Sequence, residues 1–169
     1  MKTVRLSCAH ALFKFLIAQK TIIDGKKVPL FPGAFAIYGH GNVACLGQAM
    51  EEFQSDLPGY RGHHEQSMAL SGIGYARAMR RKQIFIATSS SGPGAMNMVT
   101  AAGVALSNRL PLLLLPGDVF ASRFPDPVLQ QVENFNSPVE NQNDAFKPCL
   151  LYTSPSPRDL STSRMPSSA

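Results

Sequence analysis

One carboxylate stands beside two histidines in the segment Tyr60-Arg-Gly-His-His-Glu-Gln. Glu65 is placed where an extended segment is expected to give way to a helix, and it follows His63 and His64 directly. A carboxylate in a first helical turn commonly complements the positive end of the helix dipole. The two histidines could instead bind a metal with it, although adjacent side chains diverge and no further ligand set follows. The third interpretation is a proton-transfer carboxylate held in a coenzyme pocket.

Two glycine-rich segments each follow a short apolar run. Gly39-His-Gly-Asn42 comes after the run 34–38, and Ser91-Gly-Pro-Gly94 comes after the run 84–88. Glycine lets a backbone approach a ligand or another segment closely. We therefore interpret both segments as loops that shape a binding pocket.

The polar residues of the first loop are candidates for chemistry. His40 could contact or protonate a substrate intermediate, and Asn42 could do the same or could simply cap the following helix. The second loop is a weaker chemical candidate, and Asn97 beyond it is interpreted as structural. The candidate coenzyme-contacting residues of the two loops are Gly39, Gly41, Asn42, Gly92 and Pro93.

The elements that would position these residues alternate between helix and strand. Apolar residues recur with helical spacing from Ala9 to Ile17, with Ser7 as a plausible cap. Further helices are expected over 43–53, 65–80 and 95–107 and from Asp126-Pro127 onward, strands over 34–38, 84–88 and 110–115, a short extended piece at 59–62, and turns at Asp24-Gly25 and Pro32-Gly33.

Short, continuously apolar strands that alternate with helices are typical of a parallel sheet covered on both faces. The fold class is therefore α/β, with a parallel sheet and helices on both faces. Ligands of such sheets bind beyond the carboxyl ends of the strands, which is where both glycine-rich loops are expected.

The composition suits a folded domain and excludes several classes of protein. Of 169 residues, 44% are hydrophobic and 16% charged, and the net charge is only +5. Three cysteines without paired or metal-like spacing favour a reducing cytoplasm. The basic residues lack the interleaved aromatic side chains of nucleic-acid-binding surfaces, so no nucleic acid is expected as a partner. No membrane partner is expected either, because the apolar run 11–18 is short and contains Lys14.

The chain changes character at Cys149. Eleven of the 21 residues from Cys149 to Ala169 are Ser, Thr or Pro, and the helix–strand alternation stops. The segment 149–159 and the ending 163–169 resemble the translated ends of a sequencing-library adapter, with an index-sized gap between them. We therefore expect a native domain over 1–148 and a non-native disordered tail over 149–169; a natural Ser/Pro-rich tail is the alternative.

The ordered set of segments resembles the pyrimidine-binding domain of thiamine-diphosphate enzymes. His-His-Glu-Gln (63–66) is followed by Gly74-Tyr-Ala-Arg77, a strand, Ser91-Gly-Pro-Gly-Ala-Met-Asn97 and then Leu112-Leu-Leu-Leu-Pro-Gly-Asp118. The resemblance covers essentially residues 1–148, in the family's order and spacing. It departs from the pattern at His63-His64, where the relatives in question more usually have Arg-Asn.

The resemblance implies a role for Glu65 and a need for other parts. Glu65 would hydrogen-bond the N1′ ring nitrogen of the coenzyme's aminopyrimidine and so help remove a proton from the thiazolium ring, and His40 would face the reacting centre. The family holds the coenzyme diphosphate and Mg²⁺ in a separate C-terminal domain and shares each site between two subunits. This chain by itself is therefore expected to be inactive and to bind the coenzyme weakly.

Several details indicate one branch of that family. Asp24-Gly-Lys-Lys27, Tyr-Gly-His-Gly-Asn (38–42), 108–121 and Asn143-Asp-Ala-Phe-Lys-Pro148 resemble a ring-opening hydrolase branch that acts on a small cyclic diketone in inositol breakdown. An acetolactate-synthase-like carboligase is the alternative within the family. A non-catalytic, flavodoxin-like nucleotide-binding module is the alternative outside it, although neither a Walker sequence nor Gly-x-Gly-x-x-Gly follows the first strand.

Overall fold

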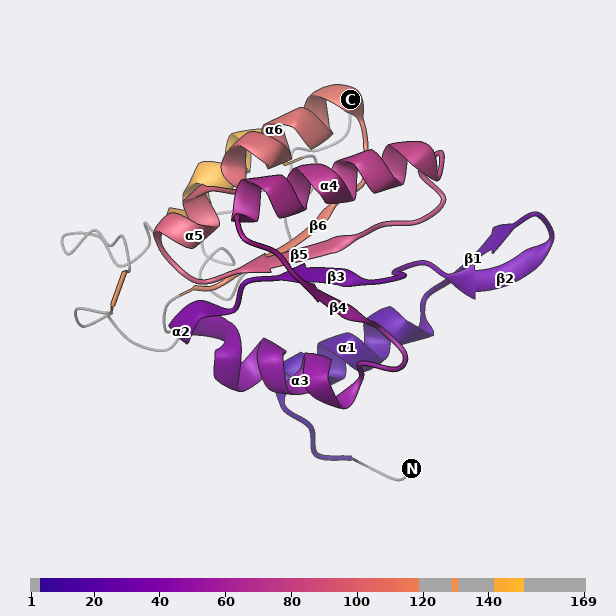
Figure 1. Cartoon of the computed structure of the whole chain (residues 1–169), viewed down its shortest axis with the longest axis horizontal. Helices are drawn as coiled ribbons and strands as arrows, with labels where there is room; N and C mark the ends of the chain where they lie inside the picture. The colour runs from indigo at the N-terminus through magenta and orange to yellow at the C-terminus, as the bar shows by residue number, and fades with distance from the viewer. Residues whose placement is uncertain (1–3, 119–128, 131–141, 151–169) are drawn as a thin grey trace, which may run out of the picture.

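A four-stranded parallel sheet forms the centre of the computed structural model, which describes residues 4–118, 129–130 and 142–150. The strand order is β4–β3–β5–β6, with β3 at Ala34–Ala36, β4 at Gly59–Arg61, β5 at Ile86–Ser89 and β6 at Leu113–Pro116. All three strand pairs are parallel, and Ala36 lies opposite Thr88 across the central pair. The predicted parallel sheet is therefore confirmed (Figure 1).

Helices cover both faces of this sheet, as predicted. One face carries α4 (Glu65–Ala78), α5 (Pro93–Met96) and α6 (Val99–Asn108), and the other carries α1 (Cys8–Ala18) and α3 (Gln48–Glu52) (Figure 1). Each face has its own apolar cluster. The cluster on the face of α1 and α3 includes Phe13, Leu16, Met50, Leu57 and Ile86, and the cluster on the face of α4 to α6 includes Ala69, Ile73, Ala87, Met98 and Ala101.

A short 3-10 helix adds to the layer formed by α4, α5 and α6. The helix η2 (Gln142–Cys149) packs against α6 through the buried Phe146, and Cys149 lies half-buried at its end. Residues 151–169 and the helix expected at Asp126-Pro127 lie outside the described residues. The predicted boundary after residue 148 stays a prediction.

The first helix forms as its sequence pattern predicts. Ser7 has extended backbone angles, and its side chain accepts a hydrogen bond from the backbone N–H of His10, so it is the N-cap of α1. Ala9, Phe13 and Leu16 follow helical spacing and are buried. This helix thereby covers the face of the sheet opposite to α4 and α6.

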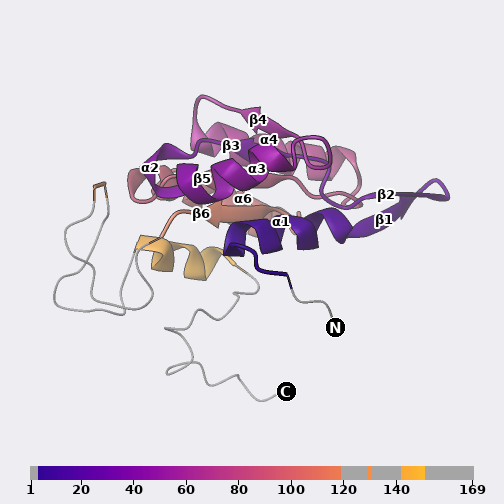
Figure 2. The ribbon, with the colours of Figure 1, turned by 90° about the horizontal axis from the view of Figure 1, so that it is seen from below.

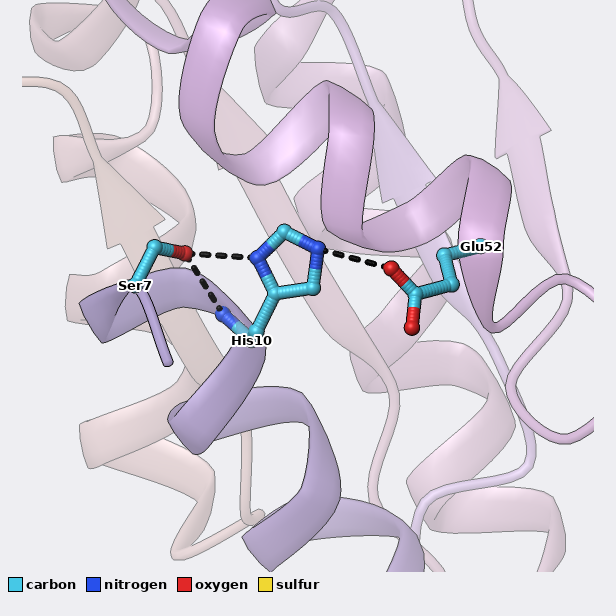
Figure 3. A network of polar contacts seen from close by, with 3 residues as sticks. All are labelled: Ser7, His10 and Glu52. Carbon is cyan, nitrogen blue, oxygen red and sulfur yellow. Dashed lines mark hydrogen bonds and ion pairs between the residues drawn. The ribbon is translucent and has the colours of Figure 1, made fainter. Parts of the chain in front are cut away.

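The His10 side chain links α1 to α3 (Figure 3). Its Nδ1 lies 2.6 Å from Ser7 Oγ and its Nε2 lies 2.9 Å from Glu52 Oε2. Because the carboxylate can only accept, Nε2 carries a proton and Nδ1 is free to accept from the Ser7 hydroxyl. The carboxylate end of the pair is exposed, so the contact is a surface clip between two helices.

Four elements differ from the sequence prediction. The turn at Asp24-Gly25 joins two unpredicted antiparallel strands, β1 (Lys20–Ile23) and β2 (Lys26–Pro29), whose hairpin extends beyond the body of the fold in Figures 1 and 2. The helix expected at 95–107 is divided into α5 and α6, and the helix expected at 43–53 is divided into a π-helix, Val43–Gly47, and α3. The segment Gly39–Asn42, predicted as a loop, is the short helix α2.

The reason for the last difference lies in Gly39. Its φ of +52° is accessible to glycine and lets the chain turn from β3 directly into a helical path. The remaining predicted elements form with shifted ends: β5 begins two residues later than expected, and α4 ends at Ala78.

Candidate functional site

The ends of β3 and β5 bring the two glycine-rich segments together. Ser90, directly after β5, lies between them: a Cβ placed on Gly39 would be 2.4 Å from its Cβ and Oγ, and one placed on Gly94 would be 3.5 Å from its Cβ. Parallel strands end at the same edge of a sheet, so this proximity follows from the topology. The prediction that both segments meet beyond the carboxyl ends of the strands is confirmed.

Glu65 is the first residue of α4 and its carboxylate lies over the second glycine-rich segment. One carboxylate oxygen, Oε2, accepts a 2.9 Å hydrogen bond from Asn97 Nδ2. The other, Oε1, lies 3.2 Å from where a Cβ would stand on Gly94. The side chain is half-buried, and its place in the first turn of a 14-residue helix favours negative charge.

His40 lies on α2, next to Gly39. Its Nε2 is 3.5 Å from Ser91 Oγ, at the outer limit of a hydrogen bond, and its side chain is exposed. The imidazole is therefore near the glycine-rich segment after β5 without being fixed by it. It is free to contact a ligand.

Asn42 is buried and links α2 to β5 directly and to β6 through Thr88. Its Nδ2 donates to Ser89 O at 2.5 Å and to Thr88 Oγ1 at 3.2 Å, and Thr88 Oγ1 donates in turn to Leu115 O at 2.7 Å. Its side chain makes no helix-capping bond, so the capping interpretation is wrong. Asn42 therefore helps to hold the strand ends together. Its predicted contact with the coenzyme stays a prediction.

Gly92 and Pro93 form a turn whose geometry requires these residue types. Gly92 has φ +66° and ψ −129°, a region that favours glycine, and Pro93 stands in the first turn of α5, where no backbone N–H is needed. The sharp turn at Gly92 matches the expected shaped segment, although Pro93 and Gly94 already belong to α5, and a coenzyme contact stays a prediction for Gly92 and Pro93. Gly41 packs close to the same segment, since a Cβ on it would lie 3.2 Å from Ser91 N.

A cavity of about 1250 Å³ adjoins the first glycine-rich segment and the edge strand β4. His63 and His40 both line it, as do Tyr38 and Glu51, whereas neither His64 nor Glu65 does. Burial, and to a smaller extent the nearby Glu51 carboxylate, raises the pKa of the Tyr38 hydroxyl above its usual value near 10. The structure thus separates the two adjacent histidines, which the sequence did not.

Ser90 is the residue of this region that sequence reasoning missed. Its Oγ is buried and has no hydrogen-bond partner among the described residues. A serine at the end of an apolar strand gives little indication of a functional role. Its position directly before Ser91-Gly-Pro-Gly94 is the feature of the sequence that could have identified it. A buried hydroxyl without a partner among the residues considered is uncommon in folded proteins.

No group of three or more His, Cys, Asp or Glu side chains within residues 4–118, 129–130 and 142–150 could hold a metal ion. In the same part of the chain, every helix is too short or too polar to pass through a bilayer.

The two glycine-rich segments meet at the carboxyl end of a parallel sheet, where proteins of this architecture bind ligands, and sequence comparison identifies the class. The family described as thiamine pyrophosphate enzyme, N-terminal TPP binding domain, matches residues 33–137, which include β3 to β6 and the whole candidate site. The chain therefore belongs to the thiamine-diphosphate (thiamine pyrophosphate) enzymes. This confirms the resemblance drawn from the sequence.

Individual relatives are more specific. The chain is 53% identical over 152 residues to the 3D-(3,5/4)-trihydroxycyclohexane-1,2-dione hydrolase of Geobacillus thermodenitrificans (strain NG80-2), and 51% identical over 152 residues to that of Clostridium tetani (strain Massachusetts / E88). Each match covers 90% of this chain but 24% of the relative. The chain thus spans about a quarter of the length of these relatives.

Proposed function

We propose that this chain supplies the pyrimidine-binding part of a thiamine-diphosphate-dependent hydrolase that opens the ring of a trihydroxycyclohexane-1,2-dione. The relatives that are about half identical to it carry that enzyme's name. The observation that carries the proposal is the half-buried Glu65 carboxylate at the start of α4, with one oxygen held by Asn97 and the other beside Gly94.

The residues present fit the aminopyrimidine half of the coenzyme. An aminopyrimidine offers ring nitrogens and an exocyclic amine, which need a carboxylate that can hold a proton and small residues that allow a flat ring to approach. Glu65 supplies the carboxylate. Gly94 supplies the space for the ring, because any side chain at this position would stand next to Glu65 Oε1. The unpartnered, buried Ser90 hydroxyl adds a polar group in the same region.

The residues of this chain would bind, orient and move a proton. When bound, the coenzyme would supply an acidic ring carbon that adds to a ketone and accepts the electron pair of the broken carbon–carbon bond. The half-buried Glu65 carboxylate at the N-terminus of α4 would accept a hydrogen bond from the proton carried by the pyrimidine ring nitrogen. His40, exposed beside Ser91, would contact the cyclic diketone.

Other parts of the site would come from outside this chain. The diphosphate and Mg²⁺ would be held by a C-terminal domain, and a second subunit would complete the pocket. The native domain would end near residue 148. The placement of the diphosphate and Mg²⁺ site outside this chain is supported by the chain spanning 24% of the length of its relatives.

The test is Glu65→Gln in a full-length enzyme that carries this segment. Loss of the carboxylate should slow hydrogen–deuterium exchange at the thiazolium carbon of bound coenzyme by about 10²–10⁴-fold, the usual contribution of a positioned acid–base group. The matched control is Glu52→Gln, which changes an exposed carboxylate on α3. Unchanged exchange in Glu65→Gln, at full coenzyme occupancy, would refute the assignment.

The reaction itself is tested by product analysis of the same enzyme. Ring-opened acid from the cyclic diketone supports the hydrolase, whereas condensation of two pyruvate molecules without ring opening would replace it by a carboligase. This readout is independent of the exchange rate. It separates an error in the substrate from an error in the role of Glu65.

A further inference from the structure

A single side-chain hydrogen bond holds the candidate proton-transfer carboxylate. Asn97 Nδ2 donates to Glu65 Oε2 at 2.9 Å across 32 residues of sequence. Among the described residues, this is the hydrogen bond that fixes the carboxylate. A glutamate side chain has three rotatable bonds, so without such a contact its carboxylate would sample several directions.

The backbone of Asn97 is itself well anchored. It lies in the break between α5 and α6, where its N–H donates to Pro93 O at 3.0 Å. Its neighbours on both sides of the break, Ala95 and Met98, are fully buried and hold the break against the core. The side chain of Asn97 therefore starts from a fixed point although it is exposed itself.

The two carboxylate oxygens have different surroundings. Oε2 is taken by Asn97, whereas Oε1 is next to Gly94, where the missing side chain leaves room. An amide that donates to one oxygen orients the whole carboxylate plane and leaves lone pairs of the other oxygen available.

We propose that Asn97 is a positioning residue, which orients Glu65 so that Oε1 accepts a hydrogen bond from the protonated ring nitrogen of an aminopyrimidine. This inference rests on the proposed function and adds a second residue to it. Asn97 would act through Glu65 and would not touch the reacting atoms.

The chain offers a matched control for Asn97. Asn108 lies at the other end of α6, is exposed, and uses its Nδ2 in a 2.9 Å bond to Val104 O within its own helix. Asn97→Ala and Asn108→Ala make the same chemical change. Asn97→Asp keeps the shape of the side chain but replaces the donor by a second carboxylate facing Glu65, which is unfavourable.

The contact is tested first, by NMR of the ¹⁵N-labelled 169-residue chain. Glu65→Gln should shift the side-chain NH₂ resonances of Asn97 and leave those of Asn108 in place. Asn97 resonances that do not respond to Glu65→Gln would overturn the positioning role.

The role of the contact is tested second, in a full-length enzyme that carries this segment and has been freed of coenzyme, by titration with 4-amino-5-hydroxymethyl-2-methylpyrimidine, the pyrimidine half of the coenzyme. Asn97→Ala and Asn97→Asp should each weaken Glu65-dependent binding about tenfold or more, as expected for loss of a hydrogen bond to a charged group, and Asn108→Ala should not. Equal affinity in wild type and Asn97→Asp would overturn the proposal. If Asn97 responds to Glu65→Gln but the wild-type full-length enzyme shows no Glu65-dependent pyrimidine binding, the proposed function fails, and the contact is structural only.

Discussion

A methyl group added at Gly39 should destabilise the fold more than the same change at another left-handed glycine. A Cβ on Gly39 would lie 2.4 Å from both Cβ and Oγ of Ser90, whose side chain is buried. Gly39 also has φ +52°, so alanine there adopts an unfavourable backbone conformation. Two independent penalties therefore meet at this position.

Their sizes can be separated with a second glycine. A left-handed alanine costs about 1–2 kcal/mol, and forcing extra volume into a packed site costs about 1–3 kcal/mol, so Gly39→Ala should lower the free energy of unfolding by about 2–5 kcal/mol. Gly25 in the β1–β2 turn has φ +76° and no heavy atom within 4 Å of its Cβ position. Gly25→Ala should therefore show the first penalty alone.

The measurement is urea unfolding of the 169-residue chain, followed by circular dichroism. The difference between the two variants reports the contact with Ser90. Ser90→Gly in the Gly39→Ala background removes the atoms that clash and should restore most of that difference. Equal losses in Gly39→Ala and Gly25→Ala would refute the close packing of the two segments after β3 and β5.

Three further changes follow from the structure. Gly74→Ala in α4, where no atom lies within 4 Å of the added Cβ, should raise the free energy of unfolding by about 0.5–1 kcal/mol in urea titrations, and a lower value would contradict an open helix surface. Tyr38→Phe should reduce the loss of stability above about pH 10: the raised pKa of Tyr38 makes the folded chain keep a proton that the unfolded chain releases, so stability falls as pH rises there. An equally steep alkaline loss in Tyr38→Phe would contradict this, and the pH 7–9 range is the control. Ser7→Ala should cost about 1 kcal/mol through loss of the N-cap, and His10→Ala less, because the His10–Glu52 pair is largely exposed; thermal unfolding that ranks them in the reverse order would show that the clip between α1 and α3 dominates.

The central sheet could be predicted because its signals are local. Each strand is a short apolar run, and helical spacing with a Ser cap marks α1. Once strands alternate with helices, the parallel arrangement and the meeting of the two glycine-rich segments follow from topology. These predictions needed no knowledge of which side chains touch.

The hairpin β1–β2 could not be predicted in the same way. Its residues are exposed or half-buried, so no apolar alternation marks the strands, and only the turn residues carry a signal. The helix α2 was missed for the opposite reason: Gly39-His-Gly-Asn42 has the composition of a turn, and the contact between Gly39 and Ser90 that shapes it joins residues far apart in sequence. Local propensity does not report such contacts.

The candidate site shows the same limit at the level of single side chains. Glycines at 39 and 94 could be recognised as sites of close approach, but what approaches them could not. The structure supplies two answers: the Ser90 side chain at Gly39, and the Glu65 carboxylate at Gly94. Both glycines thus remove volume beside a polar group, and Asn97 fixes one of these groups from the break that follows. A carboxylate that is held at one oxygen and unobstructed at the other is suited to share a proton with a flat ring. This arrangement of Glu65, Gly94 and Asn97 forms only because the sheet brings α4 next to the segment between β5 and α6.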